Sequence, residues 1–380
     1  MNGLINILFA GDFASNGRCE ELLYNKKFEK LLGNVKNEIT AADYSIVNLE
    51  SPIIKPSFKP IKKVGPSIKA PSEIADAIKY VGFNMVSLAN NHMNDYDADG
   101  ILYTMRNCYD RDIETIGAGK NLMEASETVY KIVEGKTFAF INCCEHEFSI
   151  TDKDTPGCNP LNPIDQYNSI KKAKNKADFI IVMVHGGIEM YQLPTPRMQK
   201  TYRFFVDAGA DVVINHHQHC FSGYEKYGNG LIVYGLGNFC FDWPSRENCI
   251  WNEGYLAKVT FSNSGLALQL IPYTQGLDNV GVQLMGERSK SKFNRKIDEL
   301  NSIIADSEKL QLEYNKFLIN TDNEFRAILS TYSSRITTAL CRRGLLPVFN
   351  GDYQLRRILL NISCESHLER LQHYIKTHLK

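Results

Sequence analysis

The chain has 380 residues, of which 43% are hydrophobic and 23% are charged, and its formal net charge is zero. This length and composition predict a soluble globular protein with a sizeable core, built as one large domain with an extension or as two domains. A zero net charge excludes the overall attraction to nucleic acid or to an anionic membrane that a strongly basic chain would have.

Three sequence features bear on the compartment. Ten cysteines are present without any C-x-x-C pair, which is typical of buried reduced thiols in a cytoplasmic protein. The N-terminus has no basic segment before its short apolar run, so we interpret it as a first strand and not as a signal peptide. The densest apolar run, residues 179–184, is far shorter than the roughly 20 residues of a membrane helix. We therefore predict a cytoplasmic protein with no membrane span.

Extended and helical patterns alternate along the first 214 residues. Continuous apolar runs, typical of strands buried on both faces, cover residues 5–10, 44–49, 83–89, 179–184 and 211–214. Apolar residues at helical spacing occur between them, at residues 28–42, 72–81, 98–109, 165–177 and 197–208. This alternation predicts an α/β sheet with helices on both faces.

Two hairpin patterns and a change of character follow. One hairpin covers residues 128–144, and the other pairs residues 256–261 with residues 266–272, which favours antiparallel additions or a second sheet. Further along, strand patterns end and apolar residues recur at helical spacing. We therefore predict one domain over residues 1–284 and a helical extension over residues 285–380.

Polar side chains follow five of the predicted strands at their carboxyl ends. They are Asp12, Glu50, Asn90, Asn91, His92, His185, His216, His217 and His219. In open α/β sheets this edge binds ligands, and a mixture of carboxylate, amide and imidazole groups suits Zn, Mn or Fe better than Mg or Ca. Each residue alone is more often part of a turn or a loop hydrogen bond. We interpret the set as a metal site because all five strands supply such residues at one edge.

The motifs around these residues resemble the CapA family of poly-γ-glutamate capsule biosynthesis proteins. The matching segments are Gly-Asp at 11–12, Val-Asn-Leu-Glu at 47–50, Ser-Leu-Ala-Asn-Asn-His at 87–92, His-Gly-Gly-Ile-Glu at 185–189, Gly-Ala-Asp-Val-Val-Ile at 209–214, His-x-His at 217–219 and Gly-Leu-Gly-Asn-Phe at 235–239. That family is similar to calcineurin-like metallophosphoesterases. The resemblance implies an α/β, sandwich-like core of two sheets flanked by helices, and it does not extend into the helical C-terminal extension.

The resemblance also implies a role for each matching residue. It implies two divalent metal ions, Mn, Fe or Zn, held by Asp12, Glu50, Asn91, His185, His217 and His219. Asp12 and His219 would bind the first ion and Asn91, His185 and His217 the second, with Glu50 bridging both. His92 would be the acid beside the leaving group. The groups expected near the substrate are Glu189, Asn90, Asp95 and Asn238.

Several positions depart from the family pattern. Phosphoesterases of this superfamily carry a histidine two residues after the first aspartate, where this chain has Ala14, so the first metal loses a ligand. Family members usually have Trp, Pro and Gly where this chain has Gly186, Gln218 and Asp97. These departures leave the remaining ligand types in place.

Two classes of function are open from the sequence. The first is a metal-dependent, phosphoesterase-like hydrolase that acts on a phosphorylated or polyanionic, polymer-related substrate in capsule or poly-γ-glutamate-type biosynthesis. The alternative is a non-catalytic or amide-processing accessory module of a polymer synthesis or export assembly, with synthase proteins as partners. In the extension, Arg342-Arg343 and Arg356-Arg357 either contact an anionic polymer or a partner, or lie on a solvated helical face.

Overall fold

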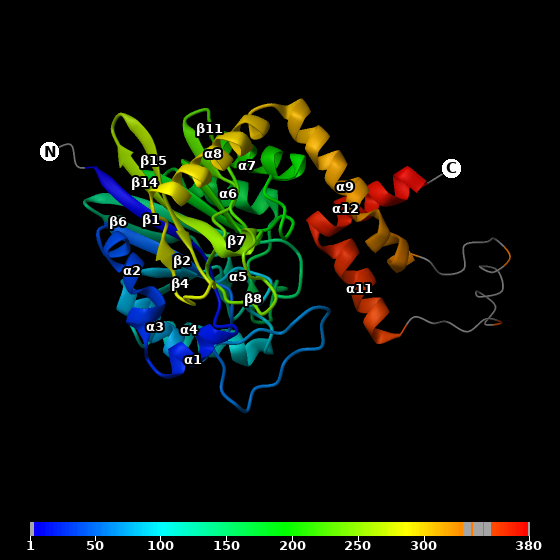
Figure 1. Cartoon of the computed structure of the whole chain (residues 1–380), viewed down its shortest axis with the longest axis horizontal. Coiled ribbons are helices and arrows are strands. Elements are labelled where there is room, and N and C mark those ends of the chain that lie inside the picture. Colours follow the sequence, from blue (N-terminus) through cyan, green and yellow to red (C-terminus); the bar gives the residue numbers. More distant parts are fainter. Residues whose placement is uncertain (1–3, 330–335, 337–344, 346–350, 379–380) are drawn as a thin grey trace.

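Two β-sheets share one core at the centre of the molecule, and helices cover their outer faces (Figure 1). The computed structural model describes residues 4–329, 336, 345 and 351–378. The predicted α/β, sandwich-like architecture of two sheets flanked by helices, followed by a helical C-terminal extension, is confirmed.

The first sheet has the strand order β16-β15-β14-β1-β2-β3-β4, and β13 also pairs with β1. Strands β1 to β4 and β13 are parallel to one another, whereas β14 pairs antiparallel with β1 and β15, and β16 pairs antiparallel with β15. The bounds are β1 (Ile5–Phe13), β2 (Tyr44–Leu49), β3 (Met85–Ser87), β4 (Glu114–Ile116), β13 (Asn238–Cys240), β14 (Glu253–Ser262), β15 (Gly265–Thr274) and β16 (Gln283–Leu284).

The second sheet has the strand order β11-β12-β10-β9-β7-β6. Its four central strands are parallel, and the edge strands β6 and β11 close antiparallel hairpins. The bounds are β6 (Val129–Val133), β7 (Lys136–Cys144), β9 (Phe179–His185), β10 (Val212–His216), β11 (Tyr224–Tyr227) and β12 (Gly230–Val233). A separate short pair joins β5 (Ala118–Gly119) to β8 (Gly157–Cys158).

Helices pack on the outer face of each sheet. Those against the first sheet are α1 (Arg18–Tyr24), α2 (Phe28–Thr40), α3 (Glu73–Val81) and α4 (Asp97–Tyr109). Those against the second are α6 (Pro163–Ala173) and α7 (Pro196–Ala208), and α5 (Leu122–Ala125) and the 3-10 helix η1 (Ile250–Asn252) are short. The bounds of α7 follow from local chemistry, because the Thr195 hydroxyl accepts from the backbone N–H of Met198 and Gly209 ends the helix at a φ of 124°.

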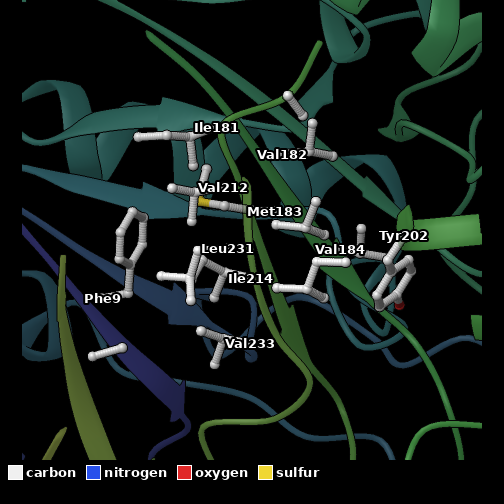
Figure 2. Packing of buried hydrophobic residues seen from close by; sticks show 14 of the residues in the cluster. Phe9, Ile181, Val182, Met183, Val184, Tyr202, Val212, Ile214, Leu231 and Val233 are labelled. Carbon is white, nitrogen blue, oxygen red and sulfur yellow. The ribbon is translucent and has the colours of Figure 1, made fainter. Parts of the chain in front are cut away.

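The strand patterns are continuously apolar because both faces of each sheet are covered. Along β1, Ile7 and Phe9 lie in the core between the sheets, whereas Leu8 and Ala10 lie in the core beneath the helices. Figure 2 shows Phe9 together with buried residues of β9, β10 and β12, in the core that both sheets share. This packing fixes the position of one sheet relative to the other.

The extension consists of α8 (Glu287–Ile304), α9 (Ser307–Leu329), α11 (Asp352–Ser363) and α12 (Glu365–His378). The apolar stripe of α8 joins the core shared by the sheets and consists of Phe293, Ile297, Leu300 and Ile304. Phe293 packs against Phe221, with ring centroids 4.6 Å apart. The helix after the last strand is therefore part of the main core, and a domain boundary between residues 284 and 285 stays a prediction.

Of the two arginine pairs in the extension, only Arg356-Arg357 lies within the described residues. Arg342 and Arg343 lie outside the described residues. Arg356 donates to Asp352 at 2.9 Å and to the backbone oxygen of Lys62 at 2.7 Å. None of the helices in the described part of the chain combines the length and the apolar character that crossing a bilayer requires.

Candidate metal centre

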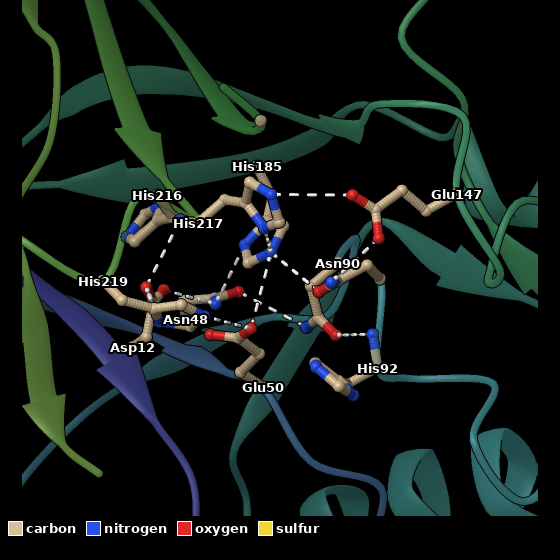
Figure 3. A network of polar contacts seen from close by, with 12 residues as sticks. Asp12, Asn48, Glu50, Asn90, His92, Glu147, His185, His216, His217 and His219 are labelled. Atoms are coloured by element: carbon tan, nitrogen blue, oxygen red, sulfur yellow. Dashed lines mark hydrogen bonds and ion pairs between the residues drawn. The ribbon is translucent and has the colours of Figure 1, made fainter. Parts of the chain in front are cut away.

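Ligand-type side chains from both sheets meet where the carboxyl ends of their parallel strands lie together (Figure 3). The strands β1 and β2 lead to Asp12 and Glu50, while β9 and β10 lead to His185 and to the loop that carries His217 and His219. All five side chains are at most 3% exposed. The six residues predicted as metal ligands are thus brought to one place, with Asn91 in the adjoining loop.

The first group of ligand atoms surrounds His185. Its Nε2 lies 3.1 Å from Nδ1 of His217, 3.1 Å from Oδ1 of Asn91 and 3.7 Å from Oε1 of Glu50. Glu50, His185 and His217 each offer one ligand atom, and these atoms lie within 4.8 Å of one another. Two imidazole nitrogens, an amide oxygen and a carboxylate oxygen therefore converge, which is a donor set suited to a transition metal or zinc.

The second group consists of Asp12, Glu50 and His219, again with ligand atoms within 4.8 Å of one another. Asn238 donates its amide hydrogens to the backbone oxygens of His219 and Trp251, so its Oδ1 is left to accept. Nδ1 of His219 lies 2.9 Å from that oxygen and donates to it. In the neutral imidazole this bond leaves the lone pair on Nε2, which lies 3.5 Å from Oε1 of Glu50.

Glu50 belongs to both groups and lacks the hydrogen bonds that a buried carboxylate needs. It is completely buried, and neither of its carboxylate oxygens has a hydrogen-bond partner among the described residues. An unpaired buried carboxylate costs several kcal/mol, and metal coordination is one of the few ways to compensate it. The residues present therefore form two candidate cation-binding groups that share Glu50.

The pKa values of the site follow from burial and from the crowding of like groups. Burial raises the pKa of Glu50 well above its usual range, and burial beside His217 holds the pKa of His185 well below its usual range. Burial acts to lower the pKa of His219, but the charges of Glu50 and Asp12 outweigh it and raise that pKa to about 10. Burial thus disfavours the charged forms of Glu50 and His185, while the neighbouring carboxylates favour the charged form of His219. Bound cations would balance the carboxylate charges.

The backbone of the histidine loop is held in an unusual conformation. His217 and His219 have φ values of 89° and 54°, in a region that side chains other than glycine rarely adopt. Such backbone strain persists where the surrounding structure enforces it, and it concentrates at functional sites. In this conformation the His219 ring lies beside Asp12 and Glu50, and the His217 ring lies beside His185 and Glu147.

Two glycines allow β13 to approach β1 and bring Asn238 beside Asp12. A Cβ atom at Gly11 would lie 1.8 Å from the backbone oxygen of Gly237, so no other residue fits there. Gly237 itself has a φ of 77°. The Gly-Asp and Gly-Leu-Gly-Asn motifs are therefore explained by one close crossing, which pairs Asp12 with Asn238 in the strand register.

His92, the predicted acid, lies beside the metal ligands and is oriented by Asp95. Its Nδ1 lies 2.8 Å from Oδ2 of Asp95, which also accepts from the backbone N–H of Ile68 at 2.7 Å. The buried ammonium of Lys63 pairs with the other oxygen of Asp95 and lies 3.2 Å from the same ring nitrogen. Burial and the charge of Lys63 lower the pKa of His92, whereas Asp95 acts to raise it.

The other predicted substrate-side residues have different surroundings. Asn90 donates to the backbone oxygen of Leu49 at 2.9 Å and accepts from the backbone N–H of His92 at 3.1 Å, so its amide holds the loop. Asn238 likewise positions His219. Glu189 is exposed and, within the described residues, forms no ion pair or hydrogen bond with the site, although its charge acts on Glu50.

Three residues at the site were not singled out from the sequence. Asn48 donates to Oδ1 of Asp12 at 2.8 Å and lies 3.3 Å from Nδ1 of His185, so it joins the two sheets. Its Val-Asn-Leu-Glu motif was an available signal. Lys63 and Glu147 lie in loops without a motif, and Glu147 accepts from Nδ2 of Asn91 at 3.1 Å. Only the tertiary fold reveals these two.

Three departures from the family pattern have clear structural surroundings. Asp97 has a φ of 59°, which explains why glycine is usual at this position. At Gly186 an added Cβ would lie 2.7 Å from Cγ of Glu145, so this glycine leaves room for the glutamate. Ala14 is completely buried and packs with Phe241 and Trp251, which fill the space beside His219.

Comparison with known proteins matches residues 6–243 to the family described as Bacterial capsule synthesis protein PGA_cap. The capsule biosynthesis protein CapA of Bacillus anthracis is 31% identical over 249 residues, covering 63% of this chain and 61% of that protein. The PGA biosynthesis protein CapA of Bacillus subtilis (strain 168) is 30% identical over 262 residues, covering 67% of this chain and 68% of that protein. The chain thus spans less than two thirds of the Bacillus anthracis protein.

Among solved structures, a 5′-nucleotidase precursor from Thermus thermophilus aligns with a TM-score of 0.42 and 11% sequence identity. The alignment covers 80% of this chain and 60% of that chain. At this score the likeness is partial, and the two-sheet architecture rests on the strand pairing described above. The match over residues 6–243 includes Asp12, Glu50 and the histidine loop. The chain therefore belongs to the PGA_cap family of bacterial capsule synthesis proteins.

Proposed function

We propose that this protein is a metal-dependent hydrolase, phosphoesterase-like in its chemistry, that acts in the biosynthesis of a capsule or of a poly-γ-glutamate-type polymer. The observation that carries the proposal is the pair of buried ligand groups that share Glu50. Two such groups on one bridging carboxylate match the arrangement that two-metal hydrolases use. The names of the Bacillus relatives supply the polymer context.

The ligand atoms divide between two ions. Asp12 and His219 would hold the first, Asn91, His185 and His217 the second, and Glu50 would bridge them. The chemistry that such a pair supplies when bound is Lewis-acid polarisation of a phosphoryl or carbonyl oxygen and activation of water. With Ala14 in place of a histidine, the first ion has fewer protein ligands than the second.

His92 is the residue best placed to donate a proton to a leaving oxygen. Asp95 fixes the ring through Nδ1, which leaves Nε2 for the substrate. Burial and Lys63 favour the neutral imidazole, and an anionic substrate beside the ring favours the charged form. The ring would therefore gain its proton as substrate binds, and Lys63 would also attract the anionic substrate.

Metal analysis combined with turnover tests the proposal. Protein purified without chelator should contain up to two equivalents of Mn, Fe or Zn and should hydrolyse aryl phosphates. Chelator should abolish turnover, and added metal should restore it. Metal-free protein that stays inactive when it is reloaded with each of the three metals would contradict the proposal.

The alternative, a non-catalytic or amide-processing accessory module, is favoured by one observation. Ala14 packs in a completely buried position, so no ligand replaces the missing histidine at the first metal. Protein that binds one equivalent of metal, cleaves no phosphoester and binds or cleaves poly-γ-glutamate would support this reading. A panel with an aryl phosphate and poly-γ-glutamate as parallel substrates separates the two functions.

A further inference from the structure

The junction between α11 and α12 lies against the loop that follows β7, beside the candidate metal centre. The backbone N–H of His146 donates to Glu365 at 3.0 Å, although 219 positions separate the two residues. The hydroxyl of Ser366 donates to Oε2 of Glu145 at 2.8 Å. Arg197 of α7 pairs with Glu145 as well. The start of α12 is therefore docked on the same loop that supplies Glu147.

Three different ligand types meet at this junction. Glu147, Cys364 and His367 offer a carboxylate oxygen, a sulfur and an imidazole nitrogen that lie within 4.8 Å of one another. Cys364 is completely buried, and the Glu147 side chain is 6% exposed. Thiolate, imidazole and carboxylate are the three ligand types of protein zinc sites, whereas thiolate is a poor ligand for Mg or Ca.

The interactions of these groups are incomplete without a cation. Nδ1 of His367 is buried and has no hydrogen-bond partner among the residues that the structure describes. The Cys364 sulfur lies 3.8 Å from Oε1 of Glu147 and 3.6 Å from Oε2 of Glu145, and it accepts a hydrogen bond from the backbone of His367. Within the same described ranges, no lysine or arginine pairs with Glu147, since Arg197 is directed to Glu145 and Glu369.

The charges of Glu147 and Cys364 are also consistent with a bound cation. Burial raises the pKa of the Cys364 thiol, and the nearby glutamates raise it further. A divalent cation would balance the carboxylate and allow the thiol to ionise.

We propose that Glu147, Cys364 and His367 bind a zinc ion that fastens the helical extension to the loop beside the metal centre. On binding, a zinc–sulfur bond forms as the thiol S–H bond breaks, and the proton passes to solvent. His367 binds as the neutral imidazole and Glu147 as the carboxylate. This inference is independent of the proposed hydrolase activity.

The position of Glu147 gives the site a further consequence. Its Oε1 lies 3.6 Å from Nε2 of His217, and its Oε2 accepts from Asn91, so it contacts two of the proposed ligands of the second ion. Zinc bound at Cys364 fixes this carboxylate from the other side. Zinc thereby couples docking of α12 to the orientation of His217 and Asn91.

Cobalt substitution tests the site in the full-length protein. The protein is stripped with chelator and titrated with Co²⁺, and the thiolate-to-cobalt charge-transfer absorption is recorded. The ligand groups around Glu50 contain no sulfur, so this band reports only a cysteine site. We expect the titration to produce the band at an intensity that corresponds to one thiolate-bound Co²⁺ per chain. Cys364→Ser should abolish the band, and Cys108→Ser, which changes a buried thiol in α4, should retain it.

Two further measurements keep the test decisive. His367→Gln retains the thiol, and it should weaken the cobalt affinity reported by the band about 10–100-fold or more. If Cys364→Ser does not fold, X-ray absorption at the zinc edge of the wild-type protein should show one sulfur ligand at about 2.3 Å. The proposal is wrong if the wild-type protein shows no thiolate band or zinc–sulfur distance, or if the band persists in Cys364→Ser. Failure of phosphoester cleavage alone would leave it intact.

Discussion

The two sheets contribute different chemistry to the candidate metal centre. The first sheet supplies oxygen ligands, with Asp12 at the end of β1, Glu50 after β2 and Asn91 after β3. The second sheet supplies nitrogen ligands, with His185 at the end of β9 and the histidine loop after β10. Neither sheet alone carries a mixed ligand set. The site is therefore a property of the seam between the sheets and depends on how they are held together.

Electrostatics explains why this division is favourable. The carboxylates of the first sheet repel one another, and so do the imidazoles of the second sheet when they are protonated. Placed face to face, each set moderates the charge of the other, as the raised pKa of His219 beside Glu50 and Asp12 illustrates. Several polar contacts cross the seam directly, and two of them involve residues outside the two ligand groups. Asn48 bridges Asp12 to His185, and Nε2 of His216 lies 3.2 Å from the backbone oxygen of Ala10.

Replacing the shared carboxylate should have the largest effect. Glu50→Gln removes a ligand from both groups, so we expect both ions to be lost and turnover to fall about 10⁴-fold or more, which corresponds to at least ~5 kcal/mol. The metal-free variant should be at least as stable as the metal-free wild type, because a buried unpaired charge is removed. Elemental analysis, kinetics and chemical denaturation measure the three quantities.

His216 provides a matched control for that substitution. It is as buried as the other histidines, but it faces the backbone of Ala10 and belongs to neither ligand group. His216→Gln should therefore retain both ions. Loss of metal from His216→Gln, or full metal content in Glu50→Gln, would show that the two groups have been assigned incorrectly.

The sequence predicted the parts of the site that depend on local order. The ligand residues lie directly at or after apolar strand runs, so their place at the sheet edge followed from the strand pattern. The strand β1 extends to Phe13, past the predicted end at residue 10, because β13 adds to it through the crossing of Gly11 and Gly237. That pairing involves residues more than 220 positions apart and leaves no local pattern.

The parts that were not predicted depend on tertiary contacts. Lys63 lies in a loop without helical or strand periodicity, and its pairing with Asp95 appears only when the chain is folded. The extension was predicted to be helical, but its contacts were not predicted: α8 enters the main core and the start of α12 reaches Glu145. The apolar stripe of an amphipathic helix indicates that one face is buried, but it does not indicate which part of the chain covers that face.

Removing the predicted acid should have the next largest effect. His92→Asn should lower turnover about 10²–10⁴-fold on phosphoesters with poor leaving groups, which need a proton on the departing oxygen. Activated aryl phosphates should be affected far less. Metal content should stay unchanged, because His92 contacts Asp95 and Lys63 and belongs to neither ligand group. Equal losses on both substrates, or an emptied metal site, would mean that His92 is a ligand.

Breaking the polar bridge across the seam should have a moderate effect. Asn48→Ala removes the hydrogen bond to Asp12 and the contact with His185, and it leaves every ligand in place. Groups that orient metal ligands typically contribute 10–100-fold to metal affinity, so we expect a loss of about that size for both ions. Competition with a chelator of known affinity measures it. A loss of affinity for only one of the two ions would mean that Asn48 orients the ligands of one sheet and does not connect the two sheets.

Loosening the apolar packing of the seam should have the smallest effect on metal binding. Ile214 is completely buried in the core shared by the sheets, on the strand that leads to the histidine loop. Ile214→Val deletes one methylene group and should lower the free energy of unfolding by about 0.5–1.5 kcal/mol, as such changes generally do. The backbone of β10 is held by parallel pairing on both sides, with β9 and β12, so the histidine loop should move little. Metal affinity should therefore change less than in Asn48→Ala. Chemical denaturation of the metal-free protein and the same chelator competition give the two values. A loss of affinity of tenfold or more in Ile214→Val would mean that apolar packing, and not the polar bridge, sets the distance between the carboxylates and the imidazoles.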